Sequence, residues 1–397
     1  MKYEWKECTI ADLGEVVGGA TPSTKKPENY ENGDISWITP KDLSTFNGRF
    51  ITRGERNITE IGLNSCSTRL LPLNSVLFSS RAPIGYVAIA AKEMCTNQGF
   101  KSVIPNSDTD YMFLYYLLKF NKGNIENMGS GTTFKEVSGN TMKSIKVYIP
   151  VDIEEQRKIA SILSALDDKI ELNNRINENL ESQAQAFFTD LFITNAKPEW
   201  KTGTVSDLGD VVGGGTPSKK VEEYYTNDGI AWITPKDLSN DKSKFITHGE
   251  TDITDLGLAK SSATLMPRGS VLFSSRAPIG YIAIADGQVS TNQGFKSIVP
   301  FDNVGTAYVY YFLKENLSAI ENVASGSTFK EVSGGTMKNF PAIIPDADTL
   351  AKFKQFCSPL LEQQRALEYE NRYLASLRDA LLPKLMNGEI DVSEVKI

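Results

Sequence analysis

A long internal duplication dominates this sequence. Residues 12–150 align with residues 207–345 at a constant offset of 195 positions, without a single insertion or deletion. This period is far longer than the roughly 20–50 residues of solenoid repeats, so each copy is expected to form a whole domain. The longest runs shared by the two copies are WITPKDLS (37–44 and 232–239), VLFSSRAPIGY (76–86 and 271–281), TNQGFKS (96–102 and 291–297) and FKEVSG (134–139 and 329–334).

Most local signals within each copy predict β-strands, because short apolar or β-branched runs are bounded by glycine, proline and asparagine. The predicted strands of the first copy are 76–80, 86–90, 101–105 and 146–150. One short helix is predicted at 111–120, and its counterpart contains 308–313. Each copy is therefore predicted to be an α+β domain with many loops.

A different kind of segment follows each copy. From Ile153 onward, apolar residues recur at alternating steps of four and three, which predicts a coiled-coil helix of about 40 residues and about 60 Å. The second copy is followed by a matching pattern. Both patterns turn polar in the middle, at Asn173 and Asn177 in one and at Gln364 and Asn371 in the other. Buried amides at such positions tend to fix register and orientation. Two unrelated surface helices remain an open alternative.

The predicted layout is domain, long helix, domain, long helix. Two similar helices in one chain can pair antiparallel, which gives a pseudo-twofold molecule with the helix pair as a spacer. The expected divisions are a first domain at 1–150, a central helix at 151–195, a second domain at 196–345, and a C-terminal helix and tail at 346–397.

Composition and charge restrict the class of function. No stretch reaches the roughly 18 apolar residues of a membrane helix, and the first residues lack the apolar core of a signal peptide, so we expect a cytoplasmic protein without membrane contact. The four cysteines are scattered without a CxxC pair, which predicts neither a disulfide frame nor a zinc site. The net charge is −7, and residues 151–200 carry five basic and ten acidic side chains. Strong attraction to DNA phosphates would therefore need positive charge from a partner.

Two segments that follow the repeats carry a specific resemblance. IPVDIEEQRKIASILSALDDKI at 149–170 resembles the entry of the central helix in the specificity subunits of type I restriction–modification enzymes, and ALLPKLMNGEI at 380–390 resembles their C-terminal end. The openings LGEVVGGATPS (13–23) and LGDVVGGGTPS (208–218) are similar to those of the family's target-recognition domains. The order of domains and helices and the overall size also match, so the resemblance covers essentially the whole chain.

The resemblance implies two duplicated target-recognition domains separated by two long antiparallel helices, with each domain reading one half of a bipartite site in double-stranded DNA. It also implies two methyltransferase (modification) subunits as partners and, in the restriction form, two motor-nuclease (restriction) subunits. S-adenosylmethionine, ATP and magnesium would belong to those partners, which methylate adenine N6 and cleave DNA. The chain itself is expected to use no cofactor.

Neither copy contains a recognisable catalytic motif. There is no Asp/Asn-Pro-Pro-aromatic motif of amino methyltransferases, no glycine-rich cofactor loop after a strand, and no GxxxxGK[ST]. The single histidine, His248, aligns with Arg53, so a mechanism that needs histidine would operate in one copy only. We therefore predict a non-catalytic subunit without a metal site, in which His248 lies on the surface and Asp42 and Asp237 anchor loops.

Side chains suited to DNA recur at matching positions of the two copies. Arginine reads guanine O6 and N7, asparagine and glutamine suit adenine, and serine, threonine and lysine hold phosphates. The predicted contacts of the first copy are Lys41, Ser79, Ser80, Arg81, Asn97, Gln98, Thr133 and Lys135. Their counterparts in the second copy are Lys236, Ser274, Ser275, Arg276, Asn292, Gln293, Thr328 and Lys330. Further phosphate candidates are Lys25, Lys26, Lys219 and Lys220.

Structural roles are an open alternative for several of these residues. A Thr-Asn-Gln-Gly run at a strand entry often forms a turn held by its own side-chain hydrogen bonds. Arg81 and its counterpart also fit the pattern of buried, salt-bridged arginines. Trp37 and Trp232 are predicted to be core residues and not stacking platforms for bases. The residues that read bases are alternatively expected where the copies differ, for example at 45–49 against 240–244.

Two other classes of function stay open on the sequence alone. An adaptor with two duplicated protein-binding or ligand-binding domains fits the layout and the net charge of −7. An unrecognised nuclease or methyltransferase would show activity with magnesium or S-adenosylmethionine. For a specificity subunit, two nearly identical domains related by a pseudo-twofold axis approach opposite strands of the duplex. That arrangement predicts two near-inverted half-sites, separated by a gap that the helices set.

Overall fold

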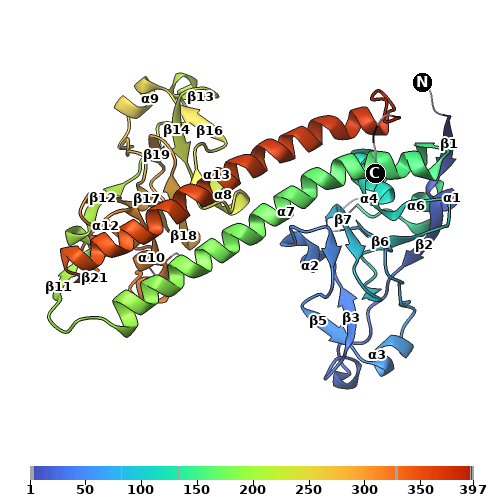
Figure 1. Ribbon diagram of the computed structural model, residues 1–397, viewed down its shortest axis with the longest axis horizontal. Helices are drawn as coiled ribbons and strands as arrows, with labels where there is room; N and C mark the ends of the chain where they lie inside the picture. Colours follow the sequence, from blue (N-terminus) through green and yellow to red (C-terminus); the bar gives the residue numbers. More distant parts are fainter. Residues whose placement is uncertain (1–3, 82, 132–134, 327–329, 394, 396–397) are drawn as a thin grey trace. The chain divides into compact units, whose positions relative to one another are not determined.

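The computed structural model describes residues 4–81, 83–131, 135–326, 330–393 and 395 (Figure 1). The chain divides into two compact units, one of residues 1–171 with 372–397 and one of residues 172–371. Each unit contains one copy of the repeat and a section of both long helices. Within the described residues, no helix is both long enough and apolar enough to span a lipid bilayer.

The first unit combines three small sheets with short helices. Its strands are β1 (Trp5–Thr9), β2 (Gly14–Gly18), β3 (Ile35–Ile38), β4 (Phe50–Ile51), β5 (Arg56–Ile58), β6 (Val76–Ser80), β7 (Ile84–Ala90), β8 (Cys95–Thr96), β9 (Lys101–Pro105) and β10 (Lys146–Pro150). Its short helices are α1 (Ile10–Leu13), α2 (Pro40–Ser44), α3 (Glu60–Asn64), α4 (Tyr111–Phe120), α5 (Lys122–Asn127) and α6 (Gly139–Ser144). The sheet orders are β1-β10, β2-β9-β6-β7-β4 and β5-β3-β8.

The second unit repeats this topology. Its strands are β11 (Lys201–Thr204), β12 (Gly209–Gly213), β13 (Tyr225–Thr226), β14 (Ile230–Ile233), β15 (Phe245–Ile246), β16 (Thr251–Ile253), β17 (Val271–Ser275), β18 (Ile279–Ala285), β19 (Val289–Thr291), β20 (Lys296–Pro300) and β21 (Pro341–Ile344). Its short helices are α8 (Pro235–Asn240), α9 (Asp255–Ala259), α10 (Thr306–Glu315), α11 (Leu317–Asn322) and α12 (Gly334–Lys338). The sheet orders are β11-β21, β12-β20-β17-β18-β15 and β13-β16-β14-β19, so among the described residues the sheets differ by the added strand β13.

The central strand β6 shows why the sequence folds in this way. All five of its residues are buried, because the sheet is covered on both faces. Alternate side chains of a strand point to opposite faces. Val76 and Phe78 accordingly join a core with helix α4, whereas Leu77 joins a second core on the other face. The predicted strands at 76–80, 101–105 and 146–150 and the helix at 111–120 are confirmed, while the predicted strand at 86–90 begins earlier, at Ile84.

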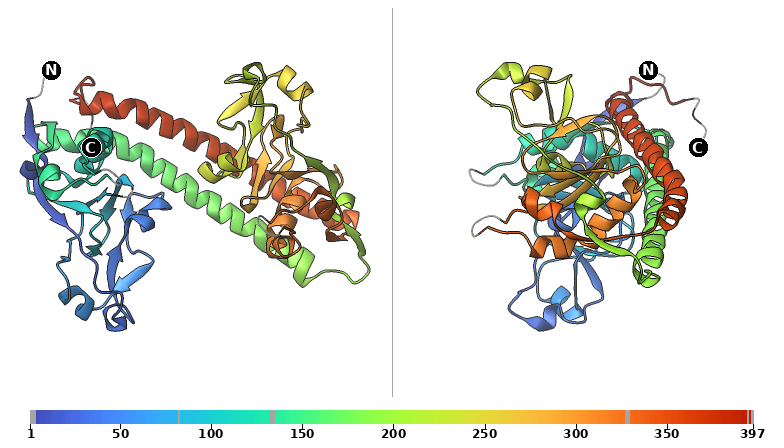
Figure 2. Two further views of the ribbon diagram at one scale, coloured as in Figure 1. Left: turned by 180° about the vertical axis from the view of Figure 1, so that it is seen from behind. Right: turned by 90° about the vertical axis from the view of Figure 1, so that its left-hand side faces the viewer.

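The two long helices are α7 (Ile153–Thr189, followed by a π-helical turn at Asp190–Thr194) and α13 (Ala347–Met386). Within each unit a section of α7 lies beside a section of α13 (Figures 1 and 2). These sections share a hydrophobic core with the adjacent domain. Leu163 and Leu385 belong to the core of the first unit, and Phe188 and Phe353 belong to that of the second. The predicted seam residues therefore pack against the domains as well as between the helices.

Contacts within the second unit fix the direction of the helix pair. The Asn173 amide donates to Asn371 Oδ1 at 2.9 Å, Gln364 Nε2 donates to the Asn177 carbonyl oxygen at 3.1 Å, and the rings of Phe187 and Phe353 stack at 6.0 Å. Residue numbers rise along α7 as they fall along α13, so the antiparallel arrangement is confirmed. Asn173 is fully buried. The polar centre that the sequence predicted is therefore a layer of paired amides.

Candidate nucleic-acid interface

The WITPKDLS motif places a lysine at the start of a short helix in each unit. Asp42 Oδ2 accepts hydrogen bonds from the Thr39 amide and hydroxyl, both at 2.7 Å, and its Oδ1 accepts the Glu55 amide at 2.7 Å. Asp237 makes the same three bonds in the second unit. The prediction that these aspartates anchor loops is confirmed. The anchored loop brings Glu55 to 2.8 Å from Lys41 Nζ.

Lys41 and Lys236 are exposed cations held by one carboxylate each. Lys236 Nζ lies 2.6 Å from Glu250, which matches the Lys41–Glu55 pair. The hydrogen bond to Glu55 raises the pKa of Lys41, and the bond to Glu250 does the same for Lys236. Both lysines therefore stay charged at neutral pH and are accessible to a phosphate.

The serines that precede Arg81 and Arg276 are buried. Ser79 Oγ donates to the Pro83 carbonyl oxygen and accepts the Tyr86 amide, both at 2.8 Å, and Ser80 Oγ donates to the Gly99 carbonyl oxygen at 3.2 Å. Ser274 and Ser275 repeat these bonds. Ser79 and Ser274 hold the turn that follows β6 or β17, whereas Ser80 and Ser275 bond to the Thr-Asn-Gln-Gly turn. All four serines are fully buried.

Each of the two arginines shares a carboxylate with a lysine. Arg81 lies 3.6 Å and Lys101 lies 3.5 Å from Glu136, and the Arg81 side chain is 35% exposed. In the second unit Arg276 lies 3.5 Å and Lys296 lies 3.3 Å from Glu331. Two cations on one carboxylate leave a net positive charge at the same place in both units.

The predicted loop beyond each arginine is closed by backbone hydrogen bonds. Ser130 and Glu136 exchange two bonds at 2.9 and 3.0 Å, and Ser325 and Glu331 do the same in the second unit. Lys135 and Lys330 lie in these loops and are exposed. The predicted contacts Thr133 and Thr328 lie outside the described residues.

The Thr-Asn-Gln-Gly run forms a turn and also presents an amide. Asn97 Oδ1 accepts the Gly99 amide at 2.8 Å, as expected for a turn held by its own side chain. Gln98 is exposed, and its carbonyl oxygen accepts a hydrogen bond from Thr21 of the preceding GGATPS loop. Asn292 and Gln293 make the same bonds to Gly294 and Thr216.

In the second unit the glycine-rich loop, helix α8 and the turn after β19 line one hollow of about 390 Å³. Its walls include Thr216 and Lys219 from the glycine-rich loop, Lys236 from helix α8, and Asn292 and Gln293 from the turn after β19. Predicted residues from three separate parts of the sequence therefore meet at one surface.

Other candidates take structural positions. Trp37 and Trp232 are buried and donate their indole N–H groups to the carbonyl oxygens of Ala20 and Gly215, so the prediction of a core role is confirmed. The His248 side chain is 65% exposed, as predicted for a surface histidine. Within the part of the chain that the structure describes, no cluster of three histidine, cysteine or acidic residues could hold a metal ion.

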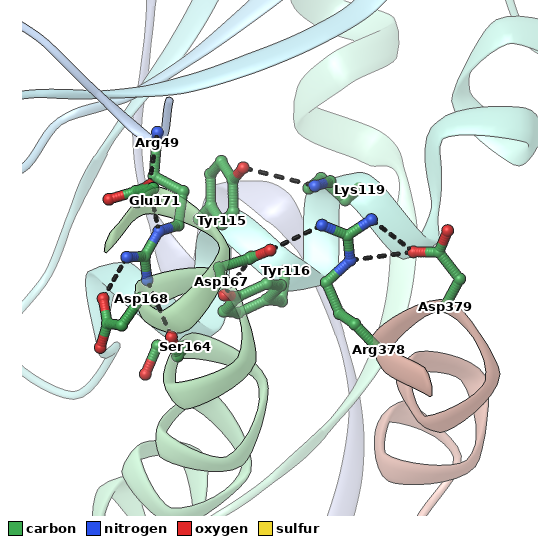
Figure 3. Close-up of polar contacts among 10 residues, drawn as sticks. All are labelled: Arg49, Tyr115, Tyr116, Lys119, Ser164, Asp167, Asp168, Glu171, Arg378 and Asp379. Atoms are coloured by element: carbon green, nitrogen blue, oxygen red, sulfur yellow. Dashed lines mark hydrogen bonds and ion pairs between the residues drawn. The ribbon is translucent and has the colours of Figure 1, made fainter. Parts of the chain in front are cut away.

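The sequence analysis missed the joint between each domain and the helices. Arg49, the last residue of a segment where the copies differ, is 4% exposed and pairs with Asp168 and with Glu171, the latter at 2.9 Å (Figure 3). Nearby, Asp167 accepts the Tyr116 hydroxyl at 2.6 Å and pairs with Arg378 at 2.6 Å. Arg49 therefore attaches the domain to helix α7 and is buried in this contact.

The corresponding joint of the second unit has Glu181 at its centre, and Glu368 accepts the backbone amides of Lys244 and Phe245 at 2.9 and 3.0 Å. Glu181 pairs with Lys244 and Lys314 and accepts the Tyr311 hydroxyl at 2.7 Å. Burial opposes ionisation of Glu181, but the two lysines outweigh it and lower the pKa of the carboxyl to about 2. Lys244 is equivalent to Arg49, so a basic residue at the end of the divergent segment was the one available signal for this joint.

The comparisons with known proteins agree with this arrangement. A family model for the type I restriction modification DNA specificity domain matches residues 2–182 and 197–368. The MjaIX specificity subunit of Methanocaldococcus jannaschii is 34% identical over 99% of this chain and 95% of its own length. The HindI specificity subunit of Haemophilus influenzae is 24% identical over 98% of this chain and the whole of that relative. A crystal structure of an S subunit from M. genitalium has the same fold, with a TM-score of 0.60 at 15% identity, over 97% of this chain and 96% of that one.

The duplicated domains, the paired long helices and the family match thus define a protein with two DNA specificity domains. The chain belongs to the family of specificity subunits of type I restriction–modification systems. In such a system it is the non-catalytic component that determines DNA specificity.

Proposed function

We propose that each repeat domain reads one half of a bipartite DNA site and that the helices set the gap between the halves. In this division, residues 1–150 and 196–345 recognise DNA, and residues 151–195 and 346–397 act as the spacer. The observation that carries the proposal is the duplicated polar surface. Arg81, Gln98 and Lys41 keep the same hydrogen bonds and ion pairs as Arg276, Gln293 and Lys236.

The two arginines are the proposed guanine readers. A guanidinium group has five N–H donors, so a single carboxylate neighbour orients it and leaves donors for guanine O6 and N7. Arg81 lies 3.6 Å from Glu136 and Arg276 lies 3.5 Å from Glu331, and about one-third of each arginine side chain is exposed. The buried serines before them support the turn and are not part of the proposed contact surface.

The glutamines are the proposed adenine readers. The threonine that donates to the carbonyl oxygen of Gln98 or Gln293 fixes the plane of the amide, and the amide nitrogen is then the group left to donate to a base. Lys41, Lys135 and their counterparts are proposed phosphate contacts. Because the readers match between units, the two half-sites are expected to be nearly inverted copies of each other.

The helices are also the proposed docking site for two methyltransferase subunits, with two motor-nuclease subunits added in the restriction form. The chain carries a net charge of −7, so much of the attraction to DNA phosphates would come from these partners. Alone, the chain should bind DNA weakly and with a small dependence on salt. A cytoplasmic location fits a function on the cell's own DNA and four free cysteines.

The proposal is tested by co-expressing the chain with the methyltransferase encoded beside it and mapping methylated adenines across the host genome. The expected result is one bipartite motif with two similar, inverted halves and a fixed gap. Methylation that does not depend on the chain, or an active partner without any motif, would overturn the proposal. Inserting one heptad in both helices should lengthen the gap and leave the halves unchanged.

A further inference from the structure

A pocket of about 260 Å³ in the first unit lies outside the surface described so far. Its walls come from the segment that differs between the copies, from strand β7, and from helices α4 and α5. The side chains that matter are Phe46, Tyr86, Tyr115, Lys119 and Lys122. The pocket therefore combines three aromatic rings with two cations.

Lys119 and Lys122 carry the positive charge of this pocket. Lys119 Nζ lies 3.4 Å from the Tyr115 hydroxyl and 5.2 Å from the centre of its ring (Figure 3). Burial lowers the pKa of Lys119, and the positive charge of Arg378 lowers it further. Among the residues that the structure describes, no ion pair joins Lys119 or Lys122 to a carboxylate. Asp167 and Asp379 offset part of the charge of Lys119, and Lys122 is exposed, so both lysines are available to an anion in the pocket.

The position of Lys122 depends on a glycine that both copies share. Gly85 has a φ of +96°, and a Cβ there would lie 2.5 Å from Lys122 Cγ, so the lysine stem lies directly on the glycine. In the second unit Gly280 has a φ of +97°, and its Cβ would lie 2.5 Å from Leu317 Cδ1. The same backbone thus supports a cation in one unit and an apolar side chain in the other.

The rest of the pocket is also different in the second unit. Lys314, the counterpart of Lys119, forms an ion pair with Glu181. Lys242 occupies the position of Asn47 and lies over the Tyr281 ring at 4.2 Å. The difference between the units is therefore one of pairing: Lys314 forms an ion pair with Glu181, whereas Lys119 forms none among the described residues.

The pocket borders the candidate DNA surface. Gly85, at its edge, follows Arg81 by four residues. A Cβ at Gly129 would lie 3.2 Å from Ile84 Cδ1 and 3.5 Å from Lys135 Cβ, so the turn before Gly85 lies against the loop that carries Lys135. An anion held by Lys119 and Lys122 would therefore be next to DNA bound at Arg81.

We propose that this pocket binds one phosphate of the DNA backbone beside the first half-site, with Lys119 and Lys122 as donors. The inference rests on the proposed function, because it assumes that Arg81 and Lys135 face the duplex. It adds an asymmetry: the first domain grips one more phosphate than the second, although both read similar bases.

The test uses the chain assembled with its methyltransferase subunits and a duplex that contains the mapped motif. Lys122→Leu installs the residue that the second unit carries at the same position, so the fold should tolerate it. The slope of log K against log salt concentration should become less steep by about 0.9, the value for one phosphate. The methylated motif should stay the same. Lys146→Gln, at an exposed lysine paired with Glu7, is the matched control and should leave the slope unchanged.

The reciprocal variant Leu317→Lys should steepen the slope by a similar amount. If the wild type binds its motif selectively and Lys122→Leu leaves the salt slope unchanged, the pocket does not bind a DNA phosphate. The proposed function would then remain intact. No selective binding by the wild type would overturn both. Titration of the wild type with inorganic phosphate distinguishes the remaining case. If free phosphate binds and Lys122→Leu leaves the DNA slope unchanged, the pocket serves a free anion and the proposal fails.

Discussion

Both units bury a basic residue at the same position of the repeat, but they surround it with acids in different ways. In the first unit Arg49 meets Asp168 and Glu171, while Asp167 separately holds Tyr116 and Arg378. In the second unit Glu181 pairs with both Lys244 and Lys314 and accepts the Tyr311 hydroxyl. The duplicated domain attaches to helix sections of different sequence. Its loop anchors therefore stay identical between the copies, whereas its attachment residues and the pocket beside them diverge.

The largest expected effect is at Glu181 in the second joint. Glu181→Gln removes the carboxylate that pairs with the buried Lys244, and breaking a buried ion pair costs about 3–5 kcal/mol of stability. Asp168→Asn is the matched change in the first unit. The Asp168 side chain is 65% exposed, so the loss there should be about 0–1 kcal/mol. Amide hydrogen exchange in β17 and β18 measures the loss of stability in Glu181→Gln. Exchange in β6 and β7 measures the loss in Asp168→Asn. Equal losses of stability in the two variants would contradict the expected difference between the buried Glu181 pair and the exposed Asp168.

Lowering the pH should destabilise the same joint. The pKa of Glu181 is lowered from 4.5 to about 2, so its contribution to stability is complete above pH 4.5 and is lost as pH falls through about 2. The loss is on the order of 3 kcal/mol. Exchange of the β17 and β18 amides at pH 5, 3 and 2 follows it. The Glu181→Gln variant should lack this component, and the idea fails if variant and wild type lose stability in parallel.

The readers should act on separate half-sites. Arg81→Lys keeps the charge but loses the two-pronged contact with guanine, which is worth about 1–3 kcal/mol, or roughly 5- to 150-fold in discrimination. Arg276→Lys should do the same for the other half. Methylation mapping should show one relaxed half in each variant. Relaxation of both halves by either change would argue that the domains do not read independently.

The smallest effects are expected at the exposed lysines. Lys41→Gln and Lys236→Gln each break an exposed ion pair, which should cost less than about 1 kcal/mol of stability. If both lysines contact phosphates, each variant of the assembled complex should bind the target with a salt slope reduced by about 0.9. A change in the sequence of the motif would count against a phosphate role.

Local pattern was enough to predict the repeat, four strands of the first copy, the helix pair and the aspartate loop anchors. These features depend on periodicity and on residues close together in the sequence, as in the Thr39–Asp42 contact. The domain joints could not be predicted, because Arg49 and Glu171 are 122 residues apart. The burial of Ser79 was also missed. A polar residue beside an arginine resembles a surface site, and its burial follows from the central position of β6 between two cores.

The central claim is that each domain reads one half of the target, and the duplication without insertions allows a direct test. We would replace residues 207–345 by a second copy of residues 12–150 and map methylated adenines with the same methyltransferase. The account predicts a perfect inverted repeat of the first half-site with the gap unchanged, and the reciprocal replacement should duplicate the second half-site. An active chimera that keeps the original motif would contradict the claim.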